Sequence, residues 1–289
     1  MRIESFKKAE NKISRFINEH SFHGFSIVNL RDIFYSKKEE WEIAEYRNVH
    51  HFISFLLKEG ILNEIKLSRE KTIYIKPGFN NFNISKAIKK DSYLAYFSAV
   101  SIHNLTFQIP KIVYSCVDRI YSNLNNRTEL KQESIDKSFS KAQRVSNNFY
   151  TYNSFKFYFF EKKIELKEIG IIHNYKTDIK YTDLERTLID IAIKPMYAGG
   201  VFEVLEAFKK AKDILDISKM KHYLDQLNYI YPYDQVIGFY LECAEYDINK
   251  INVFYNKEKT LSFYLTHNIA NKEFSKKWKL YYPLGFKTL

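Results

Sequence analysis

The hydrophobic positions of the first sixty residues recur at helical spacing in three successive stretches. The first stretch places these side chains three or four residues apart: Phe6, Ala9, Ile13, Phe16 and Ile17. This spacing predicts an amphipathic helix that buries one face. A short second helix is expected after Gly24, with Asn29 as its N-cap and with Leu30 and Phe34 turned inward.

A third helix is expected between residues 46 and 58. On a helical projection, its hydrophobic side chains fall on one side: Tyr46, Val49, Phe52, Ile53 and Leu56. Its polar side chains gather on the opposite side: Arg47, His50, His51, Ser54 and Lys58. One face of this helix would therefore be buried, and the other would be free to contact a ligand.

A β-hairpin is expected directly after this helix, which Gly60 would end. Residues 62–67 and 72–76 read as its strands, and residues 68–71 as its turn. Its tip is basic, because it carries Lys66, Arg69 and Lys71.

Three helices followed by a basic hairpin are the layout of a winged helix-turn-helix, whose third helix enters the major groove of DNA. The polar side chains of the third helix would contact base edges and phosphates, and the hairpin would add cationic contacts to the DNA backbone. Two alternatives stay open at this point. The polar helix face could simply be solvated, and a winged helix can also serve as a protein-interaction module.

The pattern changes to mixed α and β after residue 92. Tyr93 to Asn104 is expected to be helical, and Pro77-Gly78 and Lys89-Lys90-Asp91 mark a boundary between residues 78 and 92. We therefore predict an α+β protein. Residues 1–80 would form the winged helix-turn-helix domain, and residues 92–289 a larger mixed α/β domain.

Composition favours a polyanionic partner and a cytoplasmic protein. The formal charge is +11, and residues 1–90 supply 17 basic and 11 acidic side chains, a net +6 of it. No stretch is apolar enough to cross a bilayer, and the N-terminus has no signal-peptide pattern. Cys116 and Cys243 lie far apart, so neither a disulfide framework nor a thiolate zinc site is expected.

Several blocks of the second region resemble the AbiEi family of antitoxins and transcriptional regulators, which belong to AbiE abortive-infection systems of phage defence. Residues 93–106, with Gln108 and Pro110, are similar to that family's helix S-A-L-x-x-H-G-L-T followed by Q-x-P. Residues 185–190, 195–200 and 203–207 resemble its E-R-T-L-I-D, P-x-Y-x-G-G and E-V-L-E-A blocks. Residues 238–242 look like its G-Y-L-L-E segment, whereas Asn104 stands where the family commonly has glycine.

The resemblance implies two activities in one chain. The first domain would bind inverted repeats in double-stranded promoter DNA and repress its own operon, with a monomer in solution binding the repeats cooperatively. The second domain would counter a nucleotidyltransferase-like toxin without needing a stable complex with it. The basic residues implied are Arg47, Lys58, Arg69 and Lys71 in the first domain, and Arg186 and Lys194 on an antitoxin surface.

Enzymatic activity, a metal site and a cofactor are not expected. Glu161 with Lys163 and Asp178 with Lys180 have the acid-x-Lys spacing of one nuclease superfamily, but such pairs arise by chance in a lysine-rich chain. Gly199-Gly200 matches no nucleotide-binding glycine motif. The alternative is an enzyme, either a metal-dependent nuclease or a toxin-modifying transferase, that carries a winged helix for targeting. Glu185, Arg186 and Asp190 read as a structural ion network on one helix.

Overall fold

The computed structural model describes residues 4–22, 24–120, 129–164, 168–257 and 260–286. The chain divides into two compact units. The first unit contains residues 1–92 together with 149–157 and 173–179, and the second contains residues 93–148, 158–172 and 180–289. The expected division at 1–80 and 92–289 leaves the two later segments out of the first unit, because their local pattern does not distinguish them from the strands around them.

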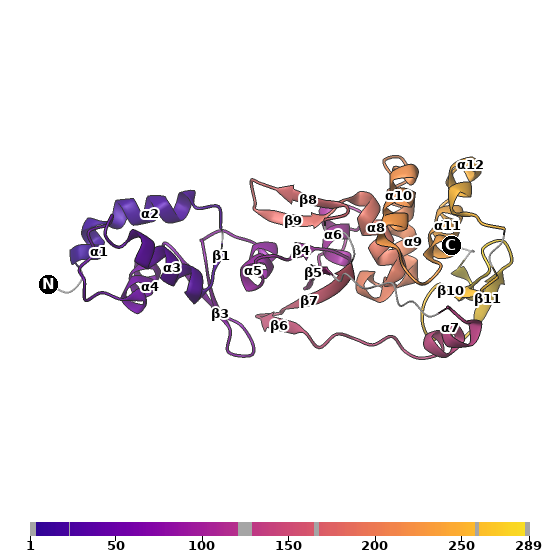
Figure 1. Ribbon diagram of the computed structural model, residues 1–289, viewed down its shortest axis with the longest axis horizontal. Helices are drawn as coiled ribbons and strands as arrows, with labels where there is room; N and C mark the ends of the chain where they lie inside the picture. The colour runs from indigo at the N-terminus through magenta and orange to yellow at the C-terminus, as the bar shows by residue number, and fades with distance from the viewer. Residues whose placement is uncertain (1–3, 23, 121–128, 165–167, 258–259, 287–289) are drawn as a thin grey trace. The chain divides into compact units, whose positions relative to one another are not determined.

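The first unit begins with four helices and a small sheet, and α5 follows. The elements in chain order are α1 (Glu4–Lys8), α2 (Glu10–Glu19), β1 (Gly24–Phe25), α3 (Ile27–Lys37), α4 (Val49–Lys58), β2 (Asn63–Lys66), β3 (Thr72–Ile75) and α5 (Asn81–Ile88). Figure 1 shows α1 to α4 grouped together, with β1 and β3 beside them. The sheet has the order β1-β3-β2, and both pairings are antiparallel.

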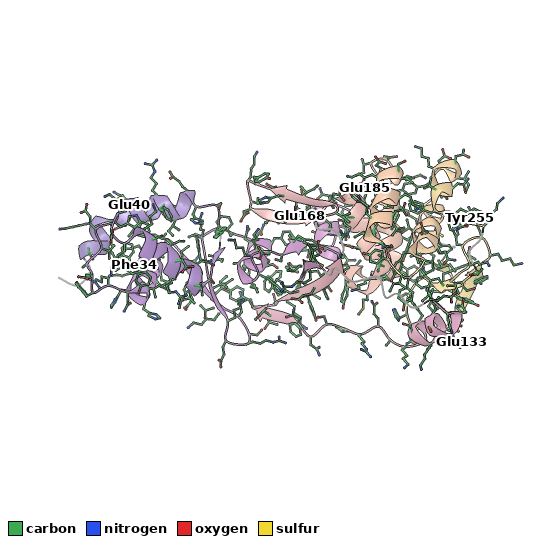
Figure 2. All side chains as sticks on the ribbon, viewed as in Figure 1. Phe34, Glu40, Glu133, Glu168, Glu185 and Tyr255 are labelled. Carbon is green, nitrogen blue, oxygen red and sulfur yellow. The ribbon has the colours of Figure 1, made fainter. Side chains whose placement is uncertain are left out.

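Aromatic side chains fill the core between these helices. The rings of Phe34 and Phe52 are 5.3 Å apart, and those of Phe6 and Phe55 are 5.2 Å apart. Figure 2 labels Phe34, which lies on α3 and is fully buried. Burial of these rings fixes α1, α3 and α4 against one another, because each large aromatic side chain removes much apolar surface from water.

The start of α3 differs from the expected one. Ser26 caps the helix, its hydroxyl accepting a hydrogen bond from the backbone N–H of Asn29 at 3.2 Å. The side chain of Asn29 accepts from the backbone N–H of Ser26 at 2.9 Å, which completes a reciprocal capping box. The prediction of Asn29 as the N-cap is therefore wrong by three residues, although Asn29 does take part in the cap.

The remaining elements form one larger sheet, one smaller sheet and a set of helices. They are β4 (Tyr93–Leu94), α6 (Phe97–Ile102), β5 (Ile112–Ile120), α7 (Gln132–Phe139), β6 (Phe149–Tyr152), β7 (Phe155–Ile164), β8 (Ile171–Asn174), β9 (Ile179–Thr182), α8 (Leu184–Ile193), η1 (Pro195–Ala198), α9 (Val201–Lys210), α10 (Ile217–Leu227), α11 (Tyr233–Cys243), α12 (Ile248–Ile251), η2 (Asn252–Phe254), β10 (Phe263–Tyr264), β11 (Lys272–Ser275) and β12 (Leu280–Pro283). The larger sheet has the order β6-β7-β5-β4-β9-β8, and the smaller one β10-β12-β11. The α+β class is confirmed.

Helix α8 packs against several helices of the second unit. Figure 1 shows α8 beside α9, α10 and α11, all of which contact it. In α11, Gly238 lies against Trp278, and a Cβ atom at this position would be 2.1 Å from Cζ3 of the indole. The helix that was expected from Tyr93 to Asn104 begins later than predicted. Tyr93 and Leu94 form strand β4, and α6 starts only at Phe97.

Within the ranges that the structure describes, none of the helices combines the length and the apolar character needed to cross a membrane.

Candidate nucleic-acid interface

Helix α4 presents one polar face to solvent. His50, His51, Ser54 and Lys58 are exposed on it. The opposite face is buried and consists of Val49, Phe52, Ile53, Phe55 and Leu56. Four of the five polar residues predicted for this helix therefore lie where a ligand can reach them. Among the described residues, Lys58 forms no ion pair, so its ammonium is available to a phosphate.

Asn48 sets the start of α4. Its side chain accepts a hydrogen bond from the backbone N–H of His51 at 3.1 Å, and Nδ1 of His51 accepts one from the backbone N–H of Asn48 at 3.3 Å. This capping box satisfies two N–H groups that the first helical turn leaves without partners. It also fixes the imidazole of His51, so that only Nε2 is left to contact a ligand.

We expect Asn48→Ala to lower the free energy of unfolding by about 1 kcal/mol, because the N–H of His51 loses its acceptor. Urea unfolding followed by circular dichroism measures the change. Asn11→Ala is the matched control, since Asn11 is exposed within α2 and alanine favours a helix interior. An equal loss in both variants would contradict the capping role.

Arg47 does not lie on the exposed face of α4. It precedes the helix, and its side chain is only 8% exposed. The guanidinium carbon is 5.5 Å from the ring centre of Phe6 and 5.1 Å from that of Tyr46. The prediction that Arg47 belongs to the polar face is wrong, because Asn48 starts the helix after it and the helical projection does not apply there. Tyr46, which was expected to be buried, is 66% exposed for the same reason.

The β2–β3 hairpin places two of its three predicted cations at the surface. Lys66 is exposed, with its ammonium 3.4 Å from the carboxylate of Glu64. Arg69 is also exposed, and its guanidinium lies over the ring of Phe149 at 5.6 Å. Arg69 and Glu70 have φ angles of 59° and 56°, so the turn uses the left-handed conformation at two non-glycine residues.

Lys71 is directed away from the surface of the hairpin, contrary to the prediction. Its ammonium donates a hydrogen bond to the backbone carbonyl of Ile88 at 2.8 Å and lies 5.3 Å from the ring centre of Tyr150. Burial and the nearby charge of Lys89 lower the pKa of Lys71. The half-buried Lys71 is therefore a structural contact within the first unit rather than a free cation.

The tip of the hairpin is anchored to β6. The backbone N–H of Ser68 donates to the carbonyl of Thr151 at 3.0 Å, and the backbone N–H of Thr151 donates to Oγ of Ser68 at 2.8 Å. Residues 68 and 151 are far apart in the chain, and no local pattern pairs them. These two hydrogen bonds fix the tip of the hairpin, which carries Arg69, against β6.

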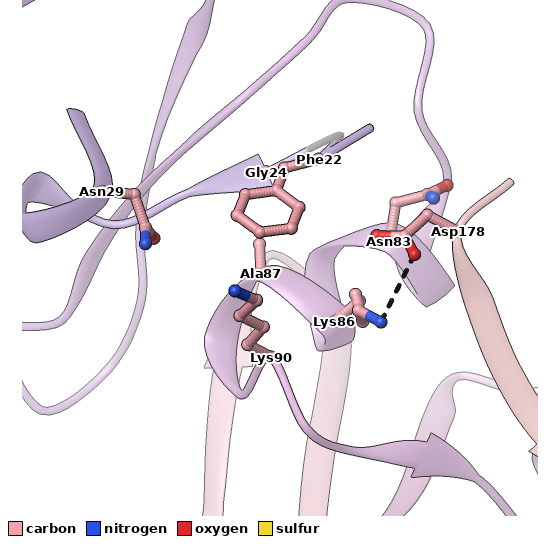
Figure 3. A pocket seen from close by; sticks show the side chains of 8 residues that line it. All are labelled: Phe22, Gly24, Asn29, Asn83, Lys86, Ala87, Lys90 and Asp178. Carbon is pink, nitrogen blue, oxygen red and sulfur yellow. Dashed lines mark ion pairs between the residues drawn. The ribbon is translucent and has the colours of Figure 1, made fainter. Parts of the chain in front are cut away.

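A small pocket beside α5 holds two further cations that sequence reasoning missed. Figure 3 shows Lys86 and Asp178 pointing toward each other, with 3.7 Å between Nζ and Oδ1. The ammonium of Lys90 lies 4.2 Å from the ring centre of Phe22 in the same pocket. Burial lowers the pKa of His20, and the charges of Lys76 and Lys90 lower it further, against the opposing effect of Asp178. Only the folded chain brings residues 86 and 178 together, so the sequence gives no signal for this cluster.

Arg186 lies inside the second unit, contrary to its predicted place on an antitoxin surface. It is 1% exposed, and its Nε donates to Oδ1 of Asp190 at 3.1 Å while Nη1 donates to the carbonyl of Ile169 at 2.6 Å. The ammonium of Lys162 contacts the other carboxylate oxygen of Asp190 at 2.6 Å. Glu185, labelled in Figure 2, is also buried in the same helix. These contacts agree with the interpretation as a structural ion network.

Lys194 is half-buried at the end of α8. Its ammonium is 5.9 Å from the ring centre of Phe160. Burial lowers the pKa of Lys194, and the charge of Lys162 adds to the effect. Of the two residues predicted for an antitoxin surface, Lys194 is the one with solvent contact.

The described side chains of the two acid-x-Lys pairs have other partners. Glu161 contacts Arg119 at 3.3 Å, and the side chain of Lys163 lies outside the described residues. Asp178 contacts His173 at 2.9 Å, and Lys180 contacts Glu168 at 2.8 Å. No group of three or more His, Cys, Asp or Glu side chains in the described part of the chain is placed to hold a metal ion. The hypothesis of a metal-dependent nuclease gains no support from these residues.

No protein-family model matches this chain, and no curated protein matches it. Among solved structures, the chain is similar to the crystal structure of the RV2827C protein from Mycobacterium tuberculosis, with a TM-score of 0.61 and 11% sequence identity. The similarity covers 97% of this chain and 93% of that one. At this identity it shows a shared fold over nearly the whole length of both proteins.

Proposed function

We propose that the first unit is a winged helix-turn-helix that binds double-stranded DNA, and that the chain is a transcriptional repressor and antitoxin. The observation that carries the proposal is the exposed polar face of α4, formed by His50, His51, Ser54 and Lys58. The element order α2-β1-α3-α4-β2-β3 and the sheet order β1-β3-β2 support it, because a winged helix has the same order of helices and strands.

The dimensions and chemistry of α4 suit a major groove. An α-helix with its side chains is about 10–12 Å across, and the major groove is about 12 Å wide, so α4 can enter it with its polar face toward the bases. Imidazole and hydroxyl groups can exchange hydrogen bonds with base edges. Lys58 at the end of the helix, with Lys66 and Arg69 on the hairpin, would contact phosphates and fix the register.

The repressor and antitoxin roles rest on the resemblance of residues 93–242 to AbiEi blocks. The chain would bind inverted repeats in its own promoter, cooperatively and as a monomer from solution, and act in the cytoplasm. The second unit would counter a nucleotidyltransferase-like toxin without a stable complex. Because Arg186 is enclosed, Lys194 is the better candidate for contact with another macromolecule.

Operator binding tests the DNA interface directly. We expect the variant Lys58→Ala/Lys66→Ala/Arg69→Ala to bind a fluorescent promoter duplex about a hundredfold more weakly at 0.1 M salt. We also expect the slope of log K against log salt to fall by about 2.7, since each lost phosphate contact removes about 0.9. Fluorescence anisotropy over a salt series measures both quantities.

A control variant with the same loss of charge separates this interface from general attraction. Lys8, Lys12 and Arg15 are exposed on α1 and α2, and their replacement by alanine also removes three positive charges. We expect this control to bind the duplex nearly as well as the wild type. Equal losses of affinity in both variants would show that the duplex is held only by non-specific electrostatic attraction. If the wild type does not bind the duplex, the proposed DNA interface is wrong.

A further inference from the structure

The small sheet of the second unit carries a row of three aromatic rings across its strands. Tyr264 of β10 is paired with Tyr281 of β12, and Tyr281 is paired with Phe274 of β11. Residues directly opposite one another in a sheet share a face, so the three rings lie side by side. The ring centres of Tyr264 and Tyr281 are 4.9 Å apart, and those of Phe274 and Tyr281 are 4.7 Å apart.

This row lies on the face of the sheet that turns away from the core. The opposite face is buried and contains Phe263, Ser275, Leu280 and Tyr282. On the outer face, Phe274 is 40% exposed and both tyrosines are partly exposed. The outer face of a sheet that packs on one side usually carries polar residues. Packing between neighbouring strands explains why each pair of rings is in contact. It does not explain why the whole row is partly exposed to water.

Positive charge lies on the same face. Lys272 is two residues before Phe274, so it is on the outer face, and its ammonium is 4.6 Å from the ring centre of Tyr281. The same ammonium is 5.2 Å from the ring centre of Tyr264. Glu273 faces the other way, since it alternates with Lys272 and Phe274 and is paired with Tyr282.

A carboxylate also borders the row. Asp136 of α7 accepts hydrogen bonds from the hydroxyl of Tyr264 at 2.9 Å and from the side-chain amide of Gln132 at 2.7 Å. Figure 1 shows α7 beside β10 and β11. Because the negative charge of Asp136 lies at the Tyr264 end and repels anions, the Phe274 end of the row is the more favourable one for a phosphate.

We propose that this aromatic row binds single-stranded nucleic acid. Unpaired bases stack on Phe274, the exposed ring on the edge strand, and Lys272 moves from the rings to a neighbouring phosphate. Every base has a π-face, so an exposed ring beside a lysine binds unpaired bases without regard to sequence. A protein partner would need an interface of roughly 1,000 Å² or more, which three rings do not supply. The proposal does not depend on duplex binding by the first unit.

Binding of labelled oligonucleotides to the full-length protein tests the proposal. The probes are fluorescein-labelled 12-nucleotide single strands of mixed sequence, one of RNA and one of DNA, and the readout is fluorescence anisotropy. We expect Phe274→Ala to weaken binding about tenfold while leaving the salt slope unchanged, because a stacking contact releases no counterions. We expect Lys272→Ala to reduce the salt slope by about 0.7.

Two controls assign the binding to this face. Phe107 is 93% exposed, and Lys210 lies 3.9 Å from its ring centre, but it is outside the row. Phe107→Ala is therefore expected to bind both probes as the wild type does. The variant Lys58→Ala/Lys66→Ala/Arg69→Ala, which is designed to lose the promoter duplex, should also keep its affinity for single strands.

The proposal is overturned by any of three results. The wild type could fail to bind both the RNA and the DNA single strand saturably. This result would refute the present proposal but not the proposed duplex binding by the first unit. Phe274→Ala and Phe107→Ala could lose the same affinity. The triple variant in the first unit could lose single strands together with the duplex, which would assign both activities to the first unit.

Discussion

Asp190→Ala should lower the free energy of unfolding of the second unit by about 3–5 kcal/mol. Asp190 is 2% exposed and contacts both Arg186 and Lys162, so its removal leaves two cations without their shared carboxylate. Urea unfolding followed by circular dichroism measures the loss. The large expected effect comes from the buried charges that remain, rather than from the net value of the ion pairs in the wild type.

An exposed pair on α10 supplies the control for Asp190. Asp225 is 59% exposed and forms an ion pair with Lys221. Ion pairs at the surface contribute about 1 kcal/mol or less, so Asp225→Ala should have a small effect. Similar losses for Asp190→Ala and Asp225→Ala would contradict the enclosed network.

The same network makes stability depend on pH. Burial alone would raise the pKa of Asp190, but the charges of Arg186 and Lys162 outweigh it and lower the pKa below its usual value. A carboxyl group with a lowered pKa in the folded state stabilises the protein above its unfolded pKa of about 3.9 and loses that contribution as the pH falls below it. The difference in stability between the wild type and Asp190→Asn should therefore shrink as the pH falls below about 4.

Gly238→Ala should destabilise the second unit by about 1–3 kcal/mol, although alanine is normally the better helix former. The added Cβ would lie 2.1 Å from Cζ3 and 2.2 Å from Cη2 of the fully buried Trp278. One of the two side chains must then leave its position in a close-packed core. The midpoint of thermal or urea unfolding measures the loss.

A double variant tests whether the clash is the cause. Trp278→Leu alone should also destabilise the protein, because it empties part of the core. In Gly238→Ala/Trp278→Leu the two losses should be less than additive, since the smaller side chain makes room for the new Cβ. Strictly additive losses, or a stabilising Gly238→Ala, would show that the contact between residues 238 and 278 does not limit packing.

The sequence predicts those parts of the first unit whose structure depends on local spacing. The buried face of α4 follows from the repeat of Val49, Phe52, Ile53 and Leu56, and the hairpin from the strand-like residues 62–67 and 72–76 on either side of the turn at residues 68–71. The error at Arg47 has a local cause as well. Asn48 is a strong capping residue, and the helical projection should have started after it.

The errors at Lys71 and Arg186 concern residues whose partners are distant in the chain. Lys71 is held by Ile88 and Tyr150, and Arg186 by Ile169 as well as by Asp190. A basic side chain in a predicted hairpin or helix looks the same in the sequence whether it is solvated or enclosed. Only tertiary contacts decide whether such a side chain is solvated or enclosed. In the first unit, residues 149–157 and 173–179 supply some of these contacts.

The discontinuity of the first unit has a consequence for its synthesis. Residues up to 92 leave the ribosome early, but residues 149–157 and 173–179, which include the anchor of the hairpin tip and the partner of Lys86, are translated later. At about 5–20 residues per second, the interval of 87 residues between positions 92 and 179 takes roughly 4–17 seconds. During this interval the nascent chain holds its helices and hairpin without their final contacts, so the N-terminal unit cannot be completed before much of the second unit has been made.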